Sequence, residues 1–219
     1  MTKLLENIFR CVNIALMNEL LQVSERMGIN IWEVVDAAKT KPFGFMPFYP
    51  GPGLGGHCIP IDPFYLSWKA REYDFHTKFI ELAGEVNENM PYYVVTRLME
   101  ALNMQRKSLA GAKVLLLGVA YKRDIDDLRE SPAIRIAELI LEKQGEVFYH
   151  DSWVPEFIIG GSSVPRVDLT EEMLRSMDSV VLLADHSNVD YGAVVRDASL
   201  ILDTRNALKA FAGDKVVRL

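Results

Sequence analysis

The hydrophobic pattern of this chain changes its period near the middle, and this change constrains the fold more than any other feature. The segment 113–121 reads KVLLLGVAY, a short apolar run typical of a strand buried on both faces. Ser131-Pro132 then predicts the start of a helix that Gly145 ends. Because strands alternate with helical segments, parallel βαβ units and a Rossmann-like sheet are expected. Further strands are predicted at 146–150, 179–184, 200–203 and 216–219.

The first half reads as helical. Apolar residues recur at helical spacing over 4–27 and stop at Gly28, a residue that commonly ends helices. The apolar stripe is wider than a lone surface helix needs, which indicates packing in a bundle or at a subunit interface. Asn30 and Glu33 resemble a capping box, and they predict a short helix through Ala38.

Two further helices are predicted in the first half of the chain. The pair Asp62-Pro63 predicts a new helix, with the aspartate as its cap and the proline in its first turn. The helical pattern returns over 77–103, where Pro91 is expected to break or kink the helix. The polar link 104–111 predicts the domain boundary.

Composition excludes several classes of protein. With 219 residues and a net charge of −6, the chain is expected to be soluble and globular, without the basic face that nucleic-acid binding needs. Three features argue against a membrane role. The Lys and Arg residues are scattered, no apolar run reaches roughly 18 residues, and the N-terminus has no signal-peptide core. Cys11 and Cys58 suggest neither a disulfide framework nor a zinc site. A cytoplasmic protein with free thiols and no metal is expected.

The segment 51–63, GPGLGGHCIPIDP, contains the spacing G-x-G-x-x-G that is typical of dinucleotide-binding loops. Such a loop must follow a strand and open a helix, so that a pyrophosphate meets backbone N–H groups. Prolines at 47 and 50 disfavour a preceding strand, and the next predicted helix begins only at Asp62. The dinucleotide interpretation is therefore rejected for this segment.

The strand-to-helix crossing is the segment 118–131. It has a single glycine at its start and a loop that carries Lys122, Arg123 and Arg129. Open α/β sheets bind ligands at the carboxyl ends of their strands, so these cations are candidates for holding phosphate. A solvated charged loop is the alternative, and spacing alone leaves both open.

Cys58 is the candidate nucleophile. A lone cysteine is most often a small buried hydrophobe, and Cys11, inside an apolar helix, fits that description. Cys58 instead lies in an irregular loop beside His57 and close to a helix start, where a thiolate is favoured. Lys3 and Asn7 share one helix face, although a solvated edge is the simpler interpretation of that pair.

Several segments together resemble one known family. They are KLLEN (3–7), GPGLGGHCIPIDP (51–63), GVAYKRDIDDLRESPA (118–133) and DTRN (203–206). In order and spacing they are similar to the NAD-dependent UDP-sugar 6-dehydrogenases, which include UDP-glucose and UDP-N-acetylhexosamine dehydrogenases.

The resemblance implies a catalytic role for Cys58. The family oxidises the C6 alcohol of a UDP-sugar to the acid in two hydride transfers to NAD+, through a thiohemiacetal and a thioester on the cysteine. By the same resemblance Lys3 stabilises the oxyanion and Asn7 positions substrate or water. Asp62 helps to activate the hydrolytic water, and His57 receives no role.

The resemblance also implies the binding residues. Arg129 is expected to reach the cofactor, and the segment 40–50 looks more like that of N-acetylhexosamine enzymes than that of UDP-glucose enzymes. The expected partners are a UDP-sugar and, from the wide stripe over 4–27, a second copy in a homodimer. The residues expected to contact the UDP-sugar are Phe48, Tyr49, Gly51, Gly53, Gly55, Gly56, Lys122 and Arg205.

The family carries an N-terminal NAD-binding domain with a genuine G-x-G-x-x-G loop, and the sequence in hand shows no counterpart to it. The expected organisation is a helical dimerisation domain with the cysteine loop at 1–105 and a Rossmann-like UDP-sugar-binding domain at 106–219. This polypeptide alone is expected not to catalyse the oxidation. The alternatives are a stand-alone nucleotide-binding module and, more weakly, a cysteine hydrolase built on Cys58 and His57.

Overall fold

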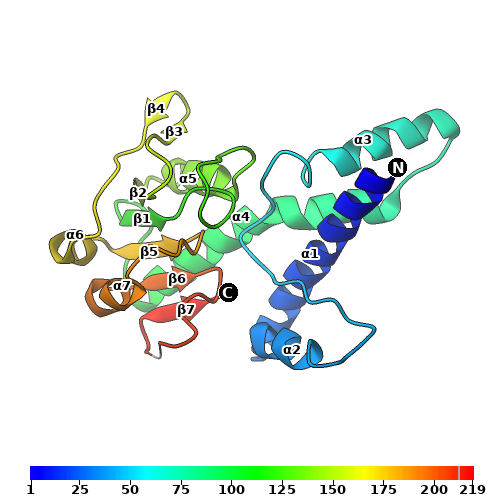
Figure 1. Cartoon of the computed structure of the whole chain (residues 1–219). Helices are drawn as coiled ribbons and strands as arrows, with labels where there is room; N and C mark the ends of the chain where they lie inside the picture. Colours follow the sequence, from blue (N-terminus) through cyan, green and yellow to red (C-terminus); the bar gives the residue numbers. More distant parts are fainter. Residues whose placement is uncertain (212) are drawn as a thin grey trace.

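The computed structural model describes residues 1–211 and 213–219, and it has a helical part and an α/β part joined by one long helix, α4 (Figure 1). In Figure 1 the start of α1 lies beside α3, and α4 runs from there into the α/β part. The helical part comprises α1 Thr2–Arg26, α2 Ile31–Ala38, α3 Asp62–Ala70, a 3₁₀ turn Arg71–Tyr73 and α4 Lys78–Met104.

The first two helices confirm the sequence prediction. Gly28 follows α1 with a φ of 70°, a left-handed conformation that glycine adopts without steric cost. The Asn30 side chain accepts the backbone N–H of Trp32 and so caps α2. Glu33 accepts the side-chain amide of Asn30 at 2.9 Å, instead of the backbone N–H that a capping box would use.

One prediction about helix limits was wrong, and a second was wrong in part. The N-cap of α3 is Ile61, and Asp62 is the first helical residue with no capping bond, because its carboxylate is bonded to α1 instead. Pro91 lies inside α4, so the predicted break does not occur, whereas the alternative of a kink stays a prediction. The proline deprives one carbonyl of its helical partner, but buried neighbours such as Met90 and Val94 hold both sides of it in the core.

The α/β part contains a five-stranded sheet in the order β2-β1-β5-β6-β7, with every pair parallel. The predicted fold class, helices followed by a Rossmann-like sheet, is therefore confirmed. The sequence analysis missed the β3–β4 hairpin, α6 and α7. The elements are β1 Lys113–Leu117, α5 Pro132–Glu142, β2 Glu146–His150, β3 Ile158–Ile159, β4 Ser162–Ser163, α6 Glu171–Ser176, β5 Ser179–Leu182, α7 Tyr191–Asp197, β6 Ile201–Asp203 and β7 Val216–Arg218.

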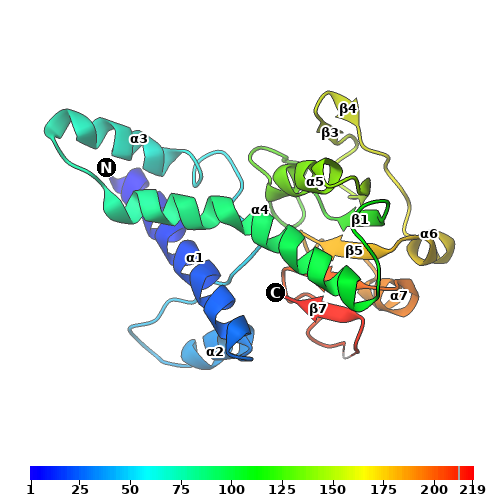
Figure 2. The ribbon, with the colours of Figure 1, turned by 180° about the vertical axis from the view of Figure 1, so that it is seen from behind.

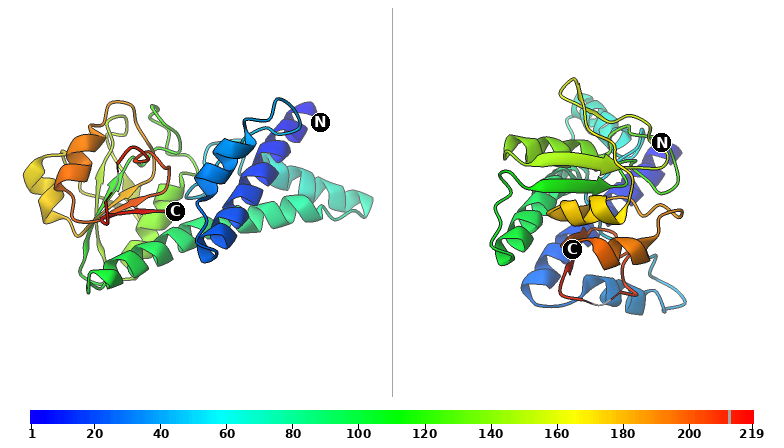
Figure 3. Two further views of the ribbon diagram at one scale, coloured as in Figure 1. Left: turned by 90° about the horizontal axis from the view of Figure 1, so that it is seen from below. Right: turned by 90° about the vertical axis from the view of Figure 1, so that its left-hand side faces the viewer.

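Each face of the sheet has its own apolar core, as the alternation of side chains in a strand requires. In β1, Val114 and Leu116 join the core formed with α4 and α5, whereas Leu115 and Leu117 join the core formed with α6 and α7. Figures 2 and 3 show the same layers, with α4 on one side of the sheet and α6 and α7 on the other. The long α4 therefore serves as a layer of the α/β core.

The sheet has a topological switch point at β1. The chain leaves β1 for β2 on one side and returns to β5 on the other. Ligands of open α/β sheets bind at such points, outside the carboxyl ends of the strands. The segments that leave the sheet there are 118–131, after β1, and 183–187, after β5.

Candidate active site

The turn that carries Cys58 is folded against the start of α1. The Cys58 carbonyl accepts the backbone N–H of Asp62 at 2.8 Å, in the turn that leads into α3. The Asp62 carboxylate in turn receives Lys3 Nζ at 3.1 Å and Asn7 Nδ2 at 2.7 Å. Two pairs of residues singled out from the sequence, Lys3 with Asn7 and Cys58 with Asp62, are more than 50 positions apart and thus form one cluster.

Electrostatics link the members of this cluster. The hydrogen bond from Lys3 holds the pKa of Asp62 below its ordinary value, against the opposing effect of burial. The same bond raises the pKa of Lys3, and the negative charge of a Cys58 thiolate would raise it further. Both groups are therefore ionised at neutral pH, and a fixed ammonium lies beside the thiol.

Asn7 is 2% exposed and both ends of its amide are occupied. Its Nδ2 donates to Asp62, and its Oδ1 accepts Arg10 Nη2 at 2.6 Å. Asn7 therefore orients Asp62 directly. Arg10, which the sequence analysis did not single out, lies three residues further along the same helix face, and this i,i+3 spacing was the signal available for it.

His57 is exposed, and its Nδ1 lies 3.8 Å from Cys58 Sγ. This is a long contact for an activated thiol, and nucleophile–base pairs usually have a third group that orients the base. No described residue makes a hydrogen bond to the other ring nitrogen of His57. The geometry therefore gives the cysteine-hydrolase alternative little support.

The glycine segment packs against the α/β part of the chain. Gly56 donates its N–H to the Arg129 carbonyl at 2.9 Å. A Cβ on Gly55 would overlap the Tyr121 side chain and lie 2.9 Å from the Glu130 carbonyl oxygen. The close approach that this glycine permits is thus to the crossing loop 118–131.

A buried amide chain holds the other end of the glycine segment. The Asn18 Oδ1 accepts the Gly51 N–H, and its Nδ2 donates to Asn87 Oδ1, both at 2.9 Å. Asn87 then donates to the Cys11 carbonyl at 3.2 Å. These residues tie α1, α4 and the segment together, and the sequence analysis missed them. Asparagines inside otherwise apolar helix faces were the available signal, because buried polar groups need partners.

The crossing loop carries two of the predicted binding cations. Arg129 is exposed and forms a two-pronged pair with Asp127, with N–O distances from 2.7 to 3.1 Å. The hydrogen bonds and charge of Asp127 raise the pKa of Arg129. Lys122 is exposed and makes no ion pair with any described residue.

Arg205 reaches the same region from the loop after β6. Its Nε donates to the Leu183 carbonyl at 2.8 Å, and its Nη1 lies 2.7 Å from where a Cβ on Gly51 would stand. Asp203 fixes this loop by accepting the N–H groups of Arg205, Ala207 and Leu208. Burial lowers the pKa of Arg205, while the nearby carboxylates of Asp185 and Asp203 oppose the shift.

The two predicted aromatic contacts lie elsewhere along the loop. Phe48 packs edge-on against Phe9 of α1, with ring centroids 5.5 Å apart. Tyr49 stacks on Trp32 of α2 at 5.7 Å, and its hydroxyl donates to Asp36 at 2.9 Å. The structure therefore holds Tyr49 against α2, through partners other than the Cys58 cluster.

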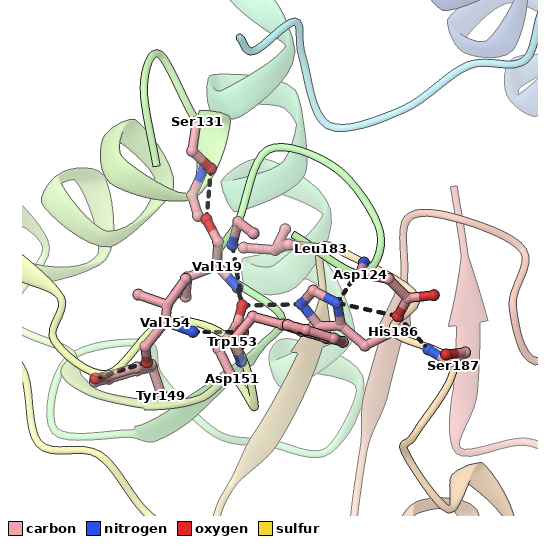
Figure 4. Close-up of polar contacts among 12 residues, drawn as sticks. Val119, Asp124, Ser131, Tyr149, Asp151, Trp153, Val154, Leu183, His186 and Ser187 are labelled. Atoms are coloured by element: carbon pink, nitrogen blue, oxygen red, sulfur yellow. Dashed lines mark hydrogen bonds and ion pairs between the residues drawn. The ribbon is translucent and has the colours of Figure 1, made fainter. Parts of the chain in front are cut away.

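A buried carboxylate–imidazole pair, which the sequence analysis did not identify, lies under the crossing loop (Figure 4). Asp151, which follows β2, accepts the N–H groups of Val119 and Ala120 at 2.7 and 3.0 Å and His186 Nε2 at 2.9 Å. Burial pushes the pKa of Asp151 upward, but hydrogen bonds from His186, Trp153 and Ala120 outweigh it and hold the pKa at about 2. The carboxylate is therefore charged at neutral pH.

A hollow on the helical side of the molecule does not include Cys58 in its lining. It has a volume of about 1440 Å³ and is lined by the aromatic side chains of α3 together with carboxylates of α4 and the start of α5, including Tyr65, Trp68, Glu85, Glu88 and Arg135. The described residues hold no cluster of three or more histidine, cysteine or acidic side chains suited to a metal ion. None of the described helices is long and apolar enough to cross a membrane.

Two family sequence patterns match this chain. The pattern of the UDP-glucose/GDP-mannose dehydrogenase family, central domain, matches residues 1–89, and that of the same family's UDP binding domain matches residues 115–210. The chain belongs to this dehydrogenase family. The first match contains the Cys58 cluster, and the second contains the crossing loop and Arg205.

Named relatives agree with this assignment. The chain is 37% identical over 216 residues to the UDP-N-acetyl-D-mannosamine dehydrogenase of Methanocaldococcus jannaschii, which covers 95% of this chain and 47% of that protein. It is 36% identical over 214 residues to the NDP-N-acetyl-D-galactosaminuronic acid dehydrogenase of Ralstonia solanacearum, covering 96% and 48%. The chain thus spans about half the length of the curated relatives it matches.

Solved structures share the fold over the whole chain. The UDP-D-ManNAc dehydrogenase from Pyrococcus horikoshii superposes with a TM-score of 0.85 at 32% identity, covering 100% of this chain and 50% of that one. The UDP-glucose dehydrogenase from Pyrobaculum islandicum gives a TM-score of 0.83 at 26% identity, covering 99% and 49%.

Proposed function

We propose that this chain is the substrate-binding and nucleophile-bearing part of an NAD-dependent UDP-sugar 6-dehydrogenase. One observation carries the proposal: Cys58, Lys3 and Asp62 form a cluster, and the segment that carries Cys58 is hydrogen-bonded through Gly56 to Arg129 in the loop of the UDP-binding region. The relatives named for UDP-N-acetyl-D-mannosamine and for an N-acetylgalactosaminuronic acid favour a UDP-N-acetylhexosamine as substrate.

The cluster suits the chemistry of an aldehyde. In the proposed reaction the Cys58 thiolate forms a bond to the C6 carbon, and the carbonyl electron pair moves to oxygen. The Lys3 ammonium, held by Asp62 at 3.1 Å, is placed to stabilise that oxyanion. Loss of a hydride from C6 to NAD+ would leave a thioester on Cys58.

Asp62 serves the hydrolysis of that thioester. Water would attack the thioester carbon, the C–S bond would break, and the departing Cys58 sulfur would take up the proton that the water loses, which gives the acid and the free thiol. Because Lys3 holds the pKa of Asp62 low, this carboxylate is a weak base. Its proposed role is therefore to accept a hydrogen bond from the attacking water and orient it, with Asn7 fixing the carboxylate.

The proposed UDP-sugar seat lies where the glycine segment meets the α/β part. Lys122 is exposed there without an ion-pair partner among the described residues, and Arg205 lies against Gly51. A cation without a carboxylate partner is available for a phosphate. The glycines Gly51, Gly53, Gly55 and Gly56 keep this segment close to the crossing loop, while Phe48 and Tyr49 are proposed to support its outer end.

The described residues do not fit a pyrophosphate cradle for NAD. The N–H groups of Val119 and Ala120, which follow β1, are bonded to Asp151. The N–H groups of Gly51 and Gly56 are bonded to Asn18 and to the Arg129 carbonyl. Arg129 is the single cofactor contact that we propose from this chain, through its Nη1, because its Nε and Nη2 are bonded to Asp127.

A homodimer is also part of the proposal. The side chains of Leu16, Leu20 and Val23 on α1 are 49%, 38% and 44% exposed, which leaves an apolar face for a second copy. Light scattering is expected to give a dimer for the chain and a monomer for Leu20→Glu. Leu141→Glu on α5, which is 44% exposed, is the control. A monomeric wild-type chain would contradict the dimer.

The two free cysteines favour a cytoplasmic setting, where thiols stay reduced.

Alkylation and calorimetry test the main proposal together. Iodoacetamide is expected to modify Cys58 before the buried Cys11, and UDP-N-acetyl-D-mannosamine is expected to slow modification of Cys58 only. Titration calorimetry should show binding of that sugar nucleotide, and Cys58→Ser should retain it. If UDP binds while Cys58 is neither reactive nor protected, the chain is a nucleotide-binding module without this chemistry. Absence of both binding and protection would refute the proposal.

A further inference from the structure

The buried pair Asp151–His186 has a defined proton arrangement. Asp151 is 0% exposed and His186 is 1% exposed. The backbone N–H of Asp124 donates to His186 Nδ1 at 2.9 Å, so this nitrogen must carry a lone pair. The proton therefore resides on Nε2, which donates to Asp151 Oδ2 at 2.9 Å. The imidazole is neutral, and both of its nitrogens are used (Figure 4).

The Asp151 carboxylate fills the position that a ligand anion takes in many open α/β sheets. It lies at the switch point beside β1 and accepts two successive backbone N–H groups, those of Val119 and Ala120. Its other oxygen accepts the N–H groups of Trp153 and Val154 at 2.8 and 3.1 Å. Because these donors are taken, a ligand in this crevice has to be held mainly by side chains of the crossing loop.

The pair fixes that loop on both sides of Lys122. Ala120, two residues before Lys122, is bonded to Asp151, and Asp124, two residues after it, is bonded to His186. Asp124 is further held by the Ser187 N–H, which donates to its Oδ1 at 2.8 Å. Asp124 has a φ of 57°, a costly conformation outside glycine that needs such anchoring.

A second bond closes the loop behind Arg129. The Ser131 hydroxyl donates to the Val119 carbonyl at 2.7 Å, and the N–H of that same Val119 is bonded to Asp151. The Arg129 carbonyl, in turn, accepts the Gly56 N–H at 2.9 Å. A contiguous chain of bonds thus runs from the buried pair to the segment that carries Cys58.

We propose that Asp151 and His186 are positioning residues for UDP-sugar binding, acting through the crossing loop that presents Lys122 and Arg129. Neither residue touches the ligand. Their effect is to hold the loop backbone in one conformation before the ligand arrives, which reduces the ordering cost of binding. This inference rests on the proposed function, because it concerns the same UDP-sugar seat.

Two histidine variants separate the halves of the pair. In His186→Gln the amide reaches the Nε2 position, so it keeps a donor for Asp151 and loses the acceptor for the Asp124 N–H. In His186→Asn the amide reaches only the Nδ1 position, so it keeps that acceptor and loses the donor. Asp178→Asn is the matched control, because Asp178 accepts the Lys113 N–H at 2.8 Å at the opposite end of β1.

Affinity for UDP, measured by calorimetry below the melting temperature of each variant, is the main readout. Each histidine variant leaves one polar group unpaired, which destabilises the binding conformation of the crossing loop. We therefore expect about tenfold weaker UDP binding. Asp178→Asn should lower the melting temperature with UDP affinity unchanged. Wild-type affinity in both histidine variants, or equal losses in the control, would overturn the positioning role.

Hydrogen exchange and nitrogen NMR supply readouts that do not depend on binding. In His186→Gln the Asp124 amide should exchange faster while Val119 and Ala120 stay protected, and His186→Asn should reverse this pattern. The wild-type imidazole should show an unprotonated Nδ1 and a protonated Nε2. If the wild-type chain does not bind UDP, the proposed function fails and so does the ligand part of this inference. Unchanged exchange in both variants refutes the loop anchoring by itself.

Discussion

Among single residues, Asp62 has the largest share in assembling the candidate site. It stands at the first position of α3, yet its carboxylate is bonded to Lys3 and Asn7 of α1. The distance in sequence is 55 residues from Asn7, so spacing alone could not reveal the cluster. The resemblance to a family brought these residues together, while their local signals indicated a helix cap and a solvated edge.

Asp62→Asn removes the charge that holds Lys3. The pKa of Asp62 is lowered in the folded protein, so its contribution to stability is present above about 3.8, the ordinary pKa. That contribution is lost as the pH falls through the folded pKa. We expect the wild type to melt at a slightly higher temperature than the variant at pH 7, and this difference should vanish in acid.

The alkylation rate of Cys58 is the second readout. Asp62→Asn should change this rate, whereas the control Asp36→Asn, which breaks a local pair with Lys39, should leave it unchanged. Equal alkylation rates in both variants would contradict this.

Asp151→Asn tests the second carboxylate through its pH dependence. The folded pKa of Asp151 is about 2, against an ordinary value of 3.8. Its pH-dependent contribution, about 2 kcal/mol, is therefore complete above about pH 5 and lost as the pH falls towards 2. Urea unfolding of wild type and variant at several pH values measures this. A stability difference that stays constant from pH 5 to about pH 2 would contradict a charged Asp151.

Among the elements, the long and strongly patterned ones were predictable. The strand pattern at 146–150 and the helix that follows Ser131 appear as predicted, and the pattern at 113–121 appears as the shorter strand β1, which ends at Leu117. Continuous apolar runs and caps are local signals. The short α6 and α7 and the β3–β4 hairpin were missed, since two to seven residues carry little periodicity. The Asp151–His186 pair was also missed, because the fold alone brings two residues 35 positions apart into contact.

The end of β1 depends on one glycine. Gly118 has a φ of 77°, and a Cβ there would lie 2.8 Å from the Ala184 Cβ. Gly118→Ala is therefore expected to lower the free energy of unfolding by about 3 kcal/mol, through backbone strain and overlap.

Gly111→Ala is the matched control for this glycine. Its φ is 79°, but nothing lies within 4 Å of the added Cβ, so only the backbone strain of about 1 kcal/mol remains. Urea unfolding of both variants gives the comparison. Equal losses at Gly111 and Gly118 would contradict the overlap with Ala184.

At the scale of the whole molecule, the glycine segment links the helical part to the α/β part. One end is bonded to Asn18 of α1, and Gly56 is bonded to the Arg129 carbonyl of the crossing loop. The sequence indicated a segment without side-chain obstruction, and it could not say what approaches the glycines. In the structure they meet Tyr121 and Glu130 of this same chain.

Gly55→Ala tests this link. A Cβ at Gly55 would overlap Tyr121 and the Glu130 carbonyl, so the segment would have to move away from the crossing loop. UDP affinity measured by calorimetry is expected to fall about tenfold. Gly44→Ala, in the same irregular stretch, meets nothing within 4 Å and should retain affinity. Loss of affinity in both variants would indicate a general effect of the stretch.

The continuity of α4 also bears on how such chains can recombine. Its N-terminal turns pack on α1 through Ala83, and its C-terminal turns supply Leu98 and Leu102 to the core that covers the sheet. A crossover placed in the polar link 104–111 would give one parent's sheet the other parent's α4, with side chains shaped for a different strand surface. An exchange point before α4 would instead separate α4 from the α1 surface on which Ala83 packs. Chimaeras between members of this family should therefore fold best when α1, α4 and the sheet are inherited from one parent.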